Sequence, residues 1–376
     1  MTQDLIWKSI KIAPTELTLS KVLRCGQAFR WKFIDGIWSC SIGDQVILLK
    51  QDDVQVQYSS IPTSPNTLKL LTNYFNLQVN FGELYDEWCK MDTRFIKNSK
   101  NFQGVRMLNQ DPWENLISFI CSTNNNVKRI SKMCENLCIN YGTYIATYQD
   151  QKHYTFPTPS KLSQPEIESE LRSLGFGYRA KFIQQTALLL SDKSEFSKLY
   201  SMRTEPHKIT HQYLQKFTGV GPKVADCVSL MSLQKHDVVP IDTHVFKIAT
   251  KDYKFSCKSK TLNKELYSEI QTFFKNLWGD YAGWAHSVLF AADLKDLNNG
   301  VNSTADKVIL KIERDSKAEL KLEPHNDILQ EESSIIELKL EEQDIKLEEE
   351  EEKIKVLSES QIRRMKRYQD RSKIRF

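Results

Sequence analysis

The chain has 376 residues, of which 40% are hydrophobic, and its 52 lysines and arginines outnumber 48 aspartates and glutamates to give a formal net charge of +4. This length and composition can bury a large core and favour two or more folded units, which excludes a chain that is disordered throughout. Residues 1–300 carry 36 basic and 29 acidic residues, whereas residues 301–376 carry 16 and 19. A mildly basic folded part permits a polyanionic partner without identifying one.

The eight cysteines contain no CxxC pair. The four-residue spacing of Cys134 and Cys138 is typical of the buried face of a helix and does not favour a metal site. Asp4 interrupts the N-terminus, and no long apolar run follows it. We therefore expect a reduced intracellular protein with neither a secretory signal nor a membrane segment.

Residues 5–105 are predicted to be rich in strands. Three short runs have the β-branched and aromatic character of strands: Phe29–Phe33, Ile37–Cys40 and Val46–Leu49. Asp35-Gly36 and Gly43-Asp44 separate these runs and are typical of hairpin turns. The pattern predicts an antiparallel sheet.

From Pro112 onward, apolar residues recur at three- and four-residue spacing, which predicts helices. The helical runs start near Trp113, Arg129, Glu166, Tyr178, Gln212, Asp242, Asn263 and Gly283. The order of elements predicts an α+β chain. An N-terminal antiparallel β-sheet domain, residues 1–105, is expected to pack on an all-helical domain, residues 106–300.

A glycine hairpin precedes one lysine in the helical part. Gly219 and Gly221 flank Val220, and Pro222 then suits the first position of a helix that carries Lys223 in its first turn. Backbone N–H groups beside a helix N-terminus suit a phosphodiester. The same positive helix end, with partial desolvation, is expected to lower the pKa of Lys223 and leave a free amine that attacks electrophilic carbon.

Asp242 follows the lysine by 19 residues. Pro240 holds Val239 out of the helical region, so Asp242 can open the next helix as its N-cap, with His244 near the same positive end. An aspartate placed there could transfer protons or stabilise developing positive charge. Local spacing alone leaves two simpler alternatives open, in which Lys223 only binds phosphate and Asp242 only caps a helix.

Residues 301–376 differ from the rest of the chain. They contain no aromatic residues except Tyr368 and Phe376, and an acidic block spans Glu348–Glu352. Such a segment buries too little apolar surface to offset its ordering entropy, so a charged, disordered tail is expected. The basic cluster at Arg363–Arg367 is a candidate for nuclear import or nonspecific DNA binding, and a solvated charge run is the simpler alternative.

Several separated motifs in one order carry a resemblance to a known family. They are Cys25–Trp31, Ile117–Asn126, Leu174–Ala180, the hairpin with Lys223 and Asp242, and Tyr281–Ala285. The chain resembles the helix-hairpin-helix DNA glycosylases with the Gly/Pro-Asp signature, and within them the eukaryotic 8-oxoguanine DNA glycosylase/lyases. The resemblance spans residues 5 to 295, places the helix-hairpin-helix at about 208–230, and suggests a fungal member.

The resemblance implies how the residues act. Lys223 would displace the oxidised base at C1′ and form a Schiff base, with Asp242 assisting, and the reaction would need neither a metal nor a redox cofactor. Cys227 and Phe290 would sandwich the flipped base, with Met231 on the same helix face as Lys223. The Gly26 carbonyl would accept a hydrogen bond from N7–H of 8-oxoguanine, where guanine presents an acceptor instead.

A second set of residues is implied to hold the DNA and the opposite cytosine. It comprises Asn124, Arg129, Tyr178 and Arg179, with Gly219, Gly221 and His244 as further DNA contacts. The chemistry fits, because an aromatic ring can wedge a base step and guanidinium groups can donate to cytosine. Taken singly, these residues also fit roles that need no contact with a base. Asn124–Asn126 could form a polar helix turn, Tyr178 could belong to the core, and the arginines could contact phosphates.

His286 departs from the family, which typically has glutamine at this position to read the Watson–Crick edge of the flipped base. A histidine cannot offer the paired donor and acceptor of an amide. Protonation near pH 6.5 is expected to change the damaged-base preference between roughly pH 5.5 and 7.5. The departure leaves open which lesions the protein accepts.

The sequence therefore predicts a bifunctional glycosylase/lyase that excises 8-oxoguanine, and formamidopyrimidine-guanine, opposite cytosine in double-stranded DNA. We expect a monomer in the nucleus, with the mitochondrion as a second location. Two alternatives stay open: a glycosylase of the same superfamily with a different base preference, and a catalytically silent helix-hairpin-helix module. The silent module would have no need of an aspartate paired with Lys223.

Overall fold

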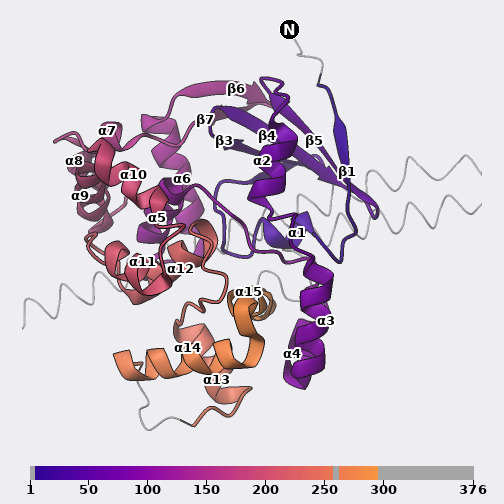
Figure 1. Ribbon diagram of the computed structural model, residues 1–376. Coiled ribbons are helices and arrows are strands. Elements are labelled where there is room, and N and C mark those ends of the chain that lie inside the picture. Colours follow the sequence, from indigo (N-terminus) through magenta and orange to yellow (C-terminus); the bar gives the residue numbers. More distant parts are fainter. Residues whose placement is uncertain (1–4, 257–261, 295–376) are drawn as a thin grey trace, which may run out of the picture. The chain divides into compact units, whose positions relative to one another are not determined.

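Five strands form an antiparallel sheet in the first part of the chain (Figure 1). The computed structural model describes residues 5–256 and 262–294. The strands are β1 Lys8–Lys11, β2 Lys32–Ile34, β3 Ile37–Ile42, β4 Gln45–Gln51 and β5 Gln55–Ile61. They lie in the order β1-β5-β4-β3-β2, with every neighbouring pair antiparallel. The predicted sheet and both of its predicted turns are confirmed.

The sheet buries one face against two short helices. Trp38 pairs with Leu49, and Leu49 with Tyr58, so these side chains share a face. Helices α1, Leu19–Val22, and α2, Thr67–Tyr74, cover that face with Leu19, Val22 and Leu71. The residues before β2 are not a strand, although the sequence predicted one from Phe29.

The last third of the predicted strand-rich segment is helical, which corrects the prediction for that stretch. Helix α3 spans Phe81–Met91, and helix α4 spans Thr93–Ser99. The Asn80 side chain caps α3 by accepting from the Glu83 N–H, and Asp92 caps α4 in the same way through Arg94. Asn and Asp are preferred N-cap residues, so Asn80 and Asp92 could have indicated in the sequence where both helices start.

The second part of the described chain is predominantly helical, as predicted. Its helices are α5 Pro112–Ser122, α6 Val127–Tyr141, α7 Pro159–Leu162, α8 Ile167–Ser173, α9 Arg179–Leu190, α10 Lys193–Ser201, α11 His207–Leu214, α12 Pro222–Ser232, α13 Thr243–Lys251, α14 Lys264–Trp278, the 3₁₀ turn η1 Gly279–Tyr281 and α15 Ala282–Asp293. Helix α12 packs on α5, and α14 packs on α15. The α+β class is confirmed.

A hairpin interrupts the helical part and was not predicted. Strand β6, Tyr144–Tyr148, pairs with β7, Gln151–Tyr154. It packs against β3 and β4, with Ile145 and Tyr148 against buried Val46 and Leu48. The hairpin therefore covers part of the five-stranded sheet, although it lies between two helices in sequence.

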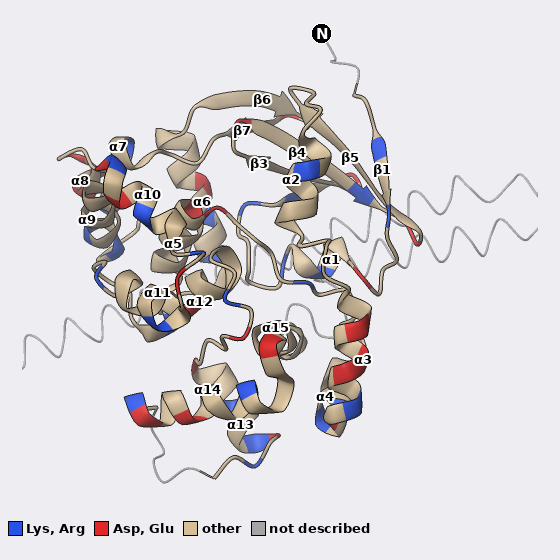
Figure 2. Ribbon diagram, viewed as in Figure 1, with Lys and Arg blue, Asp and Glu red and all other residues tan. Residues whose placement is uncertain are grey.

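Charged side chains are spread over most elements of the described chain (Figure 2). Acidic residues gather on α3, and lysines and arginines lie on α4 and α9. No helix among the described residues is long and apolar enough to cross a membrane.

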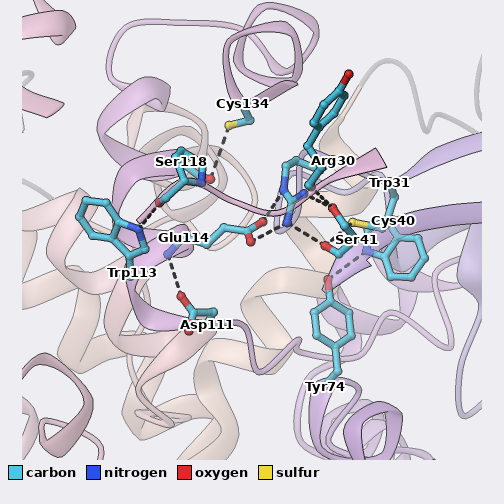
Figure 3. Close-up of polar contacts among 12 residues, drawn as sticks. Arg30, Trp31, Cys40, Ser41, Tyr74, Asp111, Trp113, Glu114, Ser118 and Cys134 are labelled. Atoms are coloured by element: carbon cyan, nitrogen blue, oxygen red, sulfur yellow. Dashed lines mark hydrogen bonds and ion pairs between the residues drawn. The ribbon is translucent and has the colours of Figure 1, made fainter. Parts of the chain in front are cut away.

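Arg30, which is buried, joins the sheet to the helical part through an ion pair with the half-buried Glu114 (Figure 3). Its Nε and Nη2 donate to the two carboxylate oxygens of Glu114, in the first turn of α5, at 2.7 and 2.6 Å. Its other donor groups bond Ser41 on β3 at 2.7 and 2.8 Å. The bidentate geometry is the strongest form of carboxylate recognition by arginine.

The described residues belong to one compact unit. The predicted disorder of residues 301–376 lies outside the described residues. The predicted boundary between sheet and helical domains at residues 105 and 106 stays a prediction.

Replacing Glu114 by alanine is expected to lower the free energy of unfolding by about 3–5 kcal/mol, because it leaves the buried Arg30 guanidinium without its partner. Urea unfolding monitored by circular dichroism measures the loss. Glu168→Ala is the matched control. Glu168 also lies in the first turn of a helix and pairs with an arginine, Arg172, but that pair is exposed. Its loss should stay below about 1 kcal/mol, and equal losses would show that Ser41 alone satisfies Arg30.

Candidate active site

The predicted helix-hairpin-helix is formed by α11, α12 and the turn between them. Gly219 has φ +84°, and a Cβ there would lie 2.3 Å from the Phe182 ring, so only glycine fits. Gly221 corrects the prediction, because its backbone is extended, with φ −86°. A Cβ at Gly221 would meet nothing within 4 Å, so neither the backbone conformation nor the available space requires glycine here. Its effect is to leave the backbone at this point of the surface without a covering side chain.

A wide groove runs past this hairpin. It has a volume of about 1010 Å³ and is lined by Gly219, Gly221, the segment 122–128, His244 and Phe290, with Lys223 and Asp242 at its base. The hairpin thus lies at the groove with a helix N-terminus beside it, an arrangement suited to a phosphodiester.

A small pocket opens beside the groove and brings together residues from three distant parts of the chain. All the predicted base-pocket residues line it: Gly26, Cys227, Met231, His286 and Phe290, together with Lys223 and Asp242. Its volume is about 40 Å³. The pocket is not enclosed, because Gly26, Lys223, Asp242 and Phe290 line both it and the groove, so it is a side opening of the groove.

The sequence gave no role to Phe119, which lines both the pocket and the groove. The Lys223 ammonium nitrogen lies 5.5 Å from the centre of the Phe119 ring, in the geometry of a cation–π contact. Phe119 lies in the Ile117–Asn126 motif, so the order of motifs contained it, but nothing in its spacing indicated a partner on α12.

Lys223 and Asp242 meet at the junction of pocket and groove. Lys223 Nζ lies 3.9 Å from Asp242 Oδ2. Asp242 Oδ1 accepts from the His244 and Val245 N–H groups at 2.9 and 3.0 Å, so the same carboxylate caps α13. Asp242 can therefore act both as a helix cap and as a partner of the lysine, because the cap uses Oδ1 and leaves Oδ2 facing Lys223.

The pKa of Lys223 corrects the sequence expectation. Burial lowers this pKa, but the neighbouring Cys227 sulfur and the Asp242 carboxylate raise it, and the outcome lies above the ordinary value. Burial raises the pKa of Cys227 to about 11, so its thiol is neutral at pH 7 and the Asp242 carboxylate, 3.9 Å away, is the charged neighbour of Lys223. The expected lowering was wrong because Cys227 and Asp242, brought close by packing, together raise the pKa of Lys223 by more than burial lowers it.

His286 is buried in the pocket with unused hydrogen-bonding capacity. Its side chain is 6% exposed, and neither ring nitrogen has a hydrogen-bond partner of normal geometry among the described residues, although a backbone contact with Gly283 raises its pKa. Burial lowers the pKa of His286 to about 4, and Asp242 offsets part of that effect. The expected protonation between pH 5.5 and 7.5 is therefore wrong for the free protein, in which the imidazole is neutral throughout that range.

The residues predicted to grip the opposite base lie where two loops meet. Tyr178 donates to the Thr123 carbonyl at 3.2 Å, and Arg179 donates to the same carbonyl and, at 3.1 Å, to that of Asn124. Arg129 donates to the Gly175 carbonyl at 3.1 Å. Tyr178 is 45% exposed, which rules out the core role. Asn124 has φ +48° and lies outside α5 and α6, which rules out a helix turn.

The two arginines differ in their access to solvent. Arg179 is 3% exposed, and its guanidinium lies 4.6 Å from the Tyr178 ring centre, whereas Arg129 bonds at an exposed position. His244, also predicted at the DNA, bonds Asp293 through Nδ1 at 3.1 Å, and its ring meets Phe290 edge to face at 6.1 Å. Among the described residues, no cluster of His, Cys, Asp and Glu could hold a metal ion.

Two family models match the chain. Residues 9–116 match the N-terminal domain of 8-oxoguanine DNA glycosylase, and residues 117–275 match the HhH-GPD superfamily of base excision DNA repair proteins. Both matches follow the predicted order of a sheet part and a helix-hairpin-helix part.

Curated proteins and solved structures give the same answer. An N-glycosylase/DNA lyase of Saccharomyces cerevisiae is 38% identical over 76% of this chain and 85% of its own length, which agrees with a fungal affiliation. An N-glycosylase/DNA lyase of Arabidopsis thaliana is 37% identical over 77% of this chain and 80% of its own. The Clostridium acetobutylicum 8-oxoguanine glycosylase/lyase, solved with double-stranded DNA containing cytosine opposite 8-oxoG, is 27% identical with a TM-score of 0.66, over 77% and 97% of the two chains.

The low pKa of His286 predicts a specific loss of stability in acid. Between pH 6.5 and about 4, the unfolded chain binds a proton at His286 and the folded chain does not, so stability falls as the pH falls through this window. His286→Gln should remove roughly 2–3 kcal/mol of the loss seen between pH 7 and 4.5. Urea unfolding at several pH values measures it. A curve for His286→Gln that runs parallel to the wild-type curve would contradict the assignment.

Proposed function

This chain belongs to the N-glycosylase/DNA lyase family, and on that premise we propose that Lys223 is its nucleophile and Asp242 its electrostatic and proton-transfer partner. The protein is a bifunctional DNA N-glycosylase and lyase that excises 8-oxoguanine from double-stranded DNA in base excision repair. One observation carries the assignment of roles: Lys223 Nζ faces Asp242 Oδ2 at 3.9 Å, inside a pocket that opens on the hairpin groove.

The lysine must lose its proton before it can attack, because an ammonium group has no free electron pair. Asp242 is the nearest base, and proton transfer to it or to the departing base would free the amine. The Nζ electron pair then bonds to C1′ of the sugar, and the bond from C1′ to the base breaks. The base leaves with that electron pair and takes up a proton.

The lyase step follows from the same covalent bond. When the sugar ring opens, Nζ and C1′ form a Schiff base, which makes the protons on C2′ acidic. Removal of one C2′ proton breaks the C3′–O bond, and the strand is cut 3′ to the lesion. Until then Asp242 stabilises the positive charge of the Schiff base, as it stabilises the ammonium form in the free protein.

The pocket residues are proposed to select the base. The neutral Cys227 thiol and the Phe290 ring would cover its two faces beside Met231, and the Gly26 carbonyl would accept from N7–H. A neutral imidazole offers one donor and one acceptor, and both ring nitrogens of His286 are without partners. His286 would therefore accept from N1–H or donate to O6 of the flipped base.

These unpaired nitrogens also favour the second candidate, in which the base preference differs from that of a family member with glutamine. Formamidopyrimidine-guanine presents the same N1–H and O6 edge as 8-oxoguanine, so it is a substrate that we propose under the first candidate. A catalytically silent DNA-binding module is disfavoured, because such a module needs no carboxylate facing the lysine.

Around the opposite base, we propose that Asn124 and Tyr178 fill the gap left by the flipped lesion while Arg129 and Arg179 bind cytosine. Gly219, Gly221 and His244 would contact the DNA backbone from the groove. The two arginines now donate to backbone carbonyls, so binding cytosine would exchange those bonds for bonds to the base. A monomer suffices for this arrangement.

The location and the domain limits rest on the sequence. The basic cluster at Arg363–Arg367 supports a nuclear location, with the mitochondrion as a further possibility. Residues 1–105 and 106–300 are the proposed sheet and glycosylase domains.

Lys223→Gln should abolish base release and borohydride trapping, because an amide cannot form a Schiff base. The dissociation constant for a duplex with 8-oxoguanine opposite cytosine should change by less than about 3-fold, since the hairpin amides remain. Single-turnover excision and fluorescence anisotropy measure the two quantities. Asp242→Asn retains the oxygen that caps α13, so it should slow excision by about 100-fold or more with little loss of binding.

Normal turnover by Lys223→Gln would contradict the Schiff-base assignment. Equal losses of rate and affinity in Asp242→Asn would instead leave this residue as a helix cap.

Arg129→Ala and Arg179→Ala should each weaken discrimination for cytosine over adenine opposite the lesion by roughly 1–3 kcal/mol. Excision rates measured on duplexes with all four opposite bases test this. Arg172→Ala is the control, because Arg172 is exposed on the neighbouring helix α8 and pairs with Glu168. A uniform loss of binding across the four opposite bases would show that the two arginines contact phosphates.

A further inference from the structure

A buried aspartate lies one helical turn beyond Lys223. Asp226 is fully buried in α12, among the apolar residues Val224, Ala225 and Val228. A carboxylate in such a place is costly unless donors surround it. The base-excision chemistry proposed above does not use Asp226, and nothing in the sequence pattern of the hairpin singled it out.

Two donor groups and two histidine rings from two other helices meet this carboxylate. From α14, Tyr267 donates to Oδ2 at 2.6 Å and Gln271 Nε2 donates to the same oxygen at 2.7 Å. From α11, His207 Nε2 lies 2.8 Å and His211 Nε2 3.5 Å from Oδ1. The carboxylate therefore joins both helices of the helix-hairpin-helix to α14.

The donors on α14 also hold the segment that leads into Asp242. The Ile241 N–H donates to the Tyr267 hydroxyl at 3.3 Å, and Gln271 Nε2 donates to the Val239 carbonyl at 3.0 Å. Asp242 is the next residue after Ile241. One continuous network thus runs from the helix of Lys223, through Asp226 and α14, to the backbone that presents Asp242.

We propose that Asp226 is a positioning residue that sets the separation of Lys223 and Asp242 by fixing α12 to the segment 239–241 through Tyr267 and Gln271. The proposal rests on the roles assigned above to the lysine and aspartate. Tyr267 and Gln271 each bond both Asp226 on α12 and the backbone of this segment. In the described chain, no other side chains link the two in this way. Misplacement of reacting groups by about 1 Å can cost on the order of 100-fold in rate, so the network matters for chemistry more than for DNA affinity.

Tyr267→Phe tests the link without touching Asp226 or the pocket. It removes the bond to Asp226 and the acceptor of the Ile241 N–H, while the ring still fills its place. The rate of single-turnover excision should fall about 10-fold or more, whereas the dissociation constant for a duplex with a tetrahydrofuran site opposite cytosine should stay within about 3-fold.

Tyr253→Phe is the matched control. Tyr253 is 5% exposed and donates to the Asp92 carboxylate at 2.6 Å, so its variant loses a bond of the same kind and length. Asp92 caps α4 and belongs to neither α12 nor the segment before Asp242. Excision by this variant should stay within about 2-fold of wild type.

Asp226 itself is tested by two substitutions. In Asp226→Asn, the amide oxygen can still accept from Tyr267 and Gln271, and its NH₂ can donate to His207 in the other tautomer. This variant should retain excision within about 5-fold of wild type, while Asp226→Ala should be as slow as Tyr267→Phe or slower. If Asp226→Ala fails to fold, the comparison of Tyr267→Phe with Tyr253→Phe decides the question.

The proposal is overturned if Tyr267→Phe excises as fast as Tyr253→Phe, if rate and affinity fall together, or if Asp226→Asn is as slow as Asp226→Ala. All variants are also trapped with borohydride on a preformed abasic site. Wild-type protein that traps the abasic site but does not release 8-oxoguanine would contradict the proposed substrate. The trapping rates of the variants would still test the positioning role in that case.

Discussion

The ion pair between Arg30 and Glu114 is the constraint on which the pocket depends. Gly26 lies in a loop of the sheet part, and it must face α12 and α15 of the helical part. Arg30, four residues later, is held to both Glu114 and Ser41, and Gln27 donates to the Arg106 carbonyl at 2.9 Å. Because a buried pair gains little net energy over apolar packing, its value here lies in fixing where this loop meets the helices.

Within the pocket, Asp242 sets the charge. It keeps Lys223 protonated in the free protein, while burial keeps His286 neutral. The site thus holds one balanced pair of charges and one uncharged ring that can donate and accept. In the proposed mechanism, the proton on Lys223 would be available to the departing base, so the aspartate that delays attack would also keep a proton where one is needed.

Local signals in the sequence were enough to place the hairpin, the first helical turn that carries Lys223 and the helix cap at Asp242, because each has a short-range cause. Gly219 needs a positive φ, Pro222 starts a helix, and Asp242 follows an extended segment. The pKa of Lys223 could not be predicted in this way, since it depends on a carboxylate brought close only by tertiary packing. The burial of Asp226 could not be predicted for the same reason. Its hydrogen-bond partners lie on α11 and α14, and a helical pattern alone predicts that a single aspartate is exposed.

The pocket and the groove share part of their lining. Phe290, Lys223 and Asp242 line both the pocket and the groove, so DNA in the groove contacts the residues that admit the base. Phe290 packs against His244 and His286, and His244 is held by Asp293. Under the proposed function, a base held against this row would meet the ring nitrogens of His286 at its edge. A base that bonds those nitrogens would gain free energy, whereas one that leaves them unpaired would lose it, so the same ring would favour one base over another.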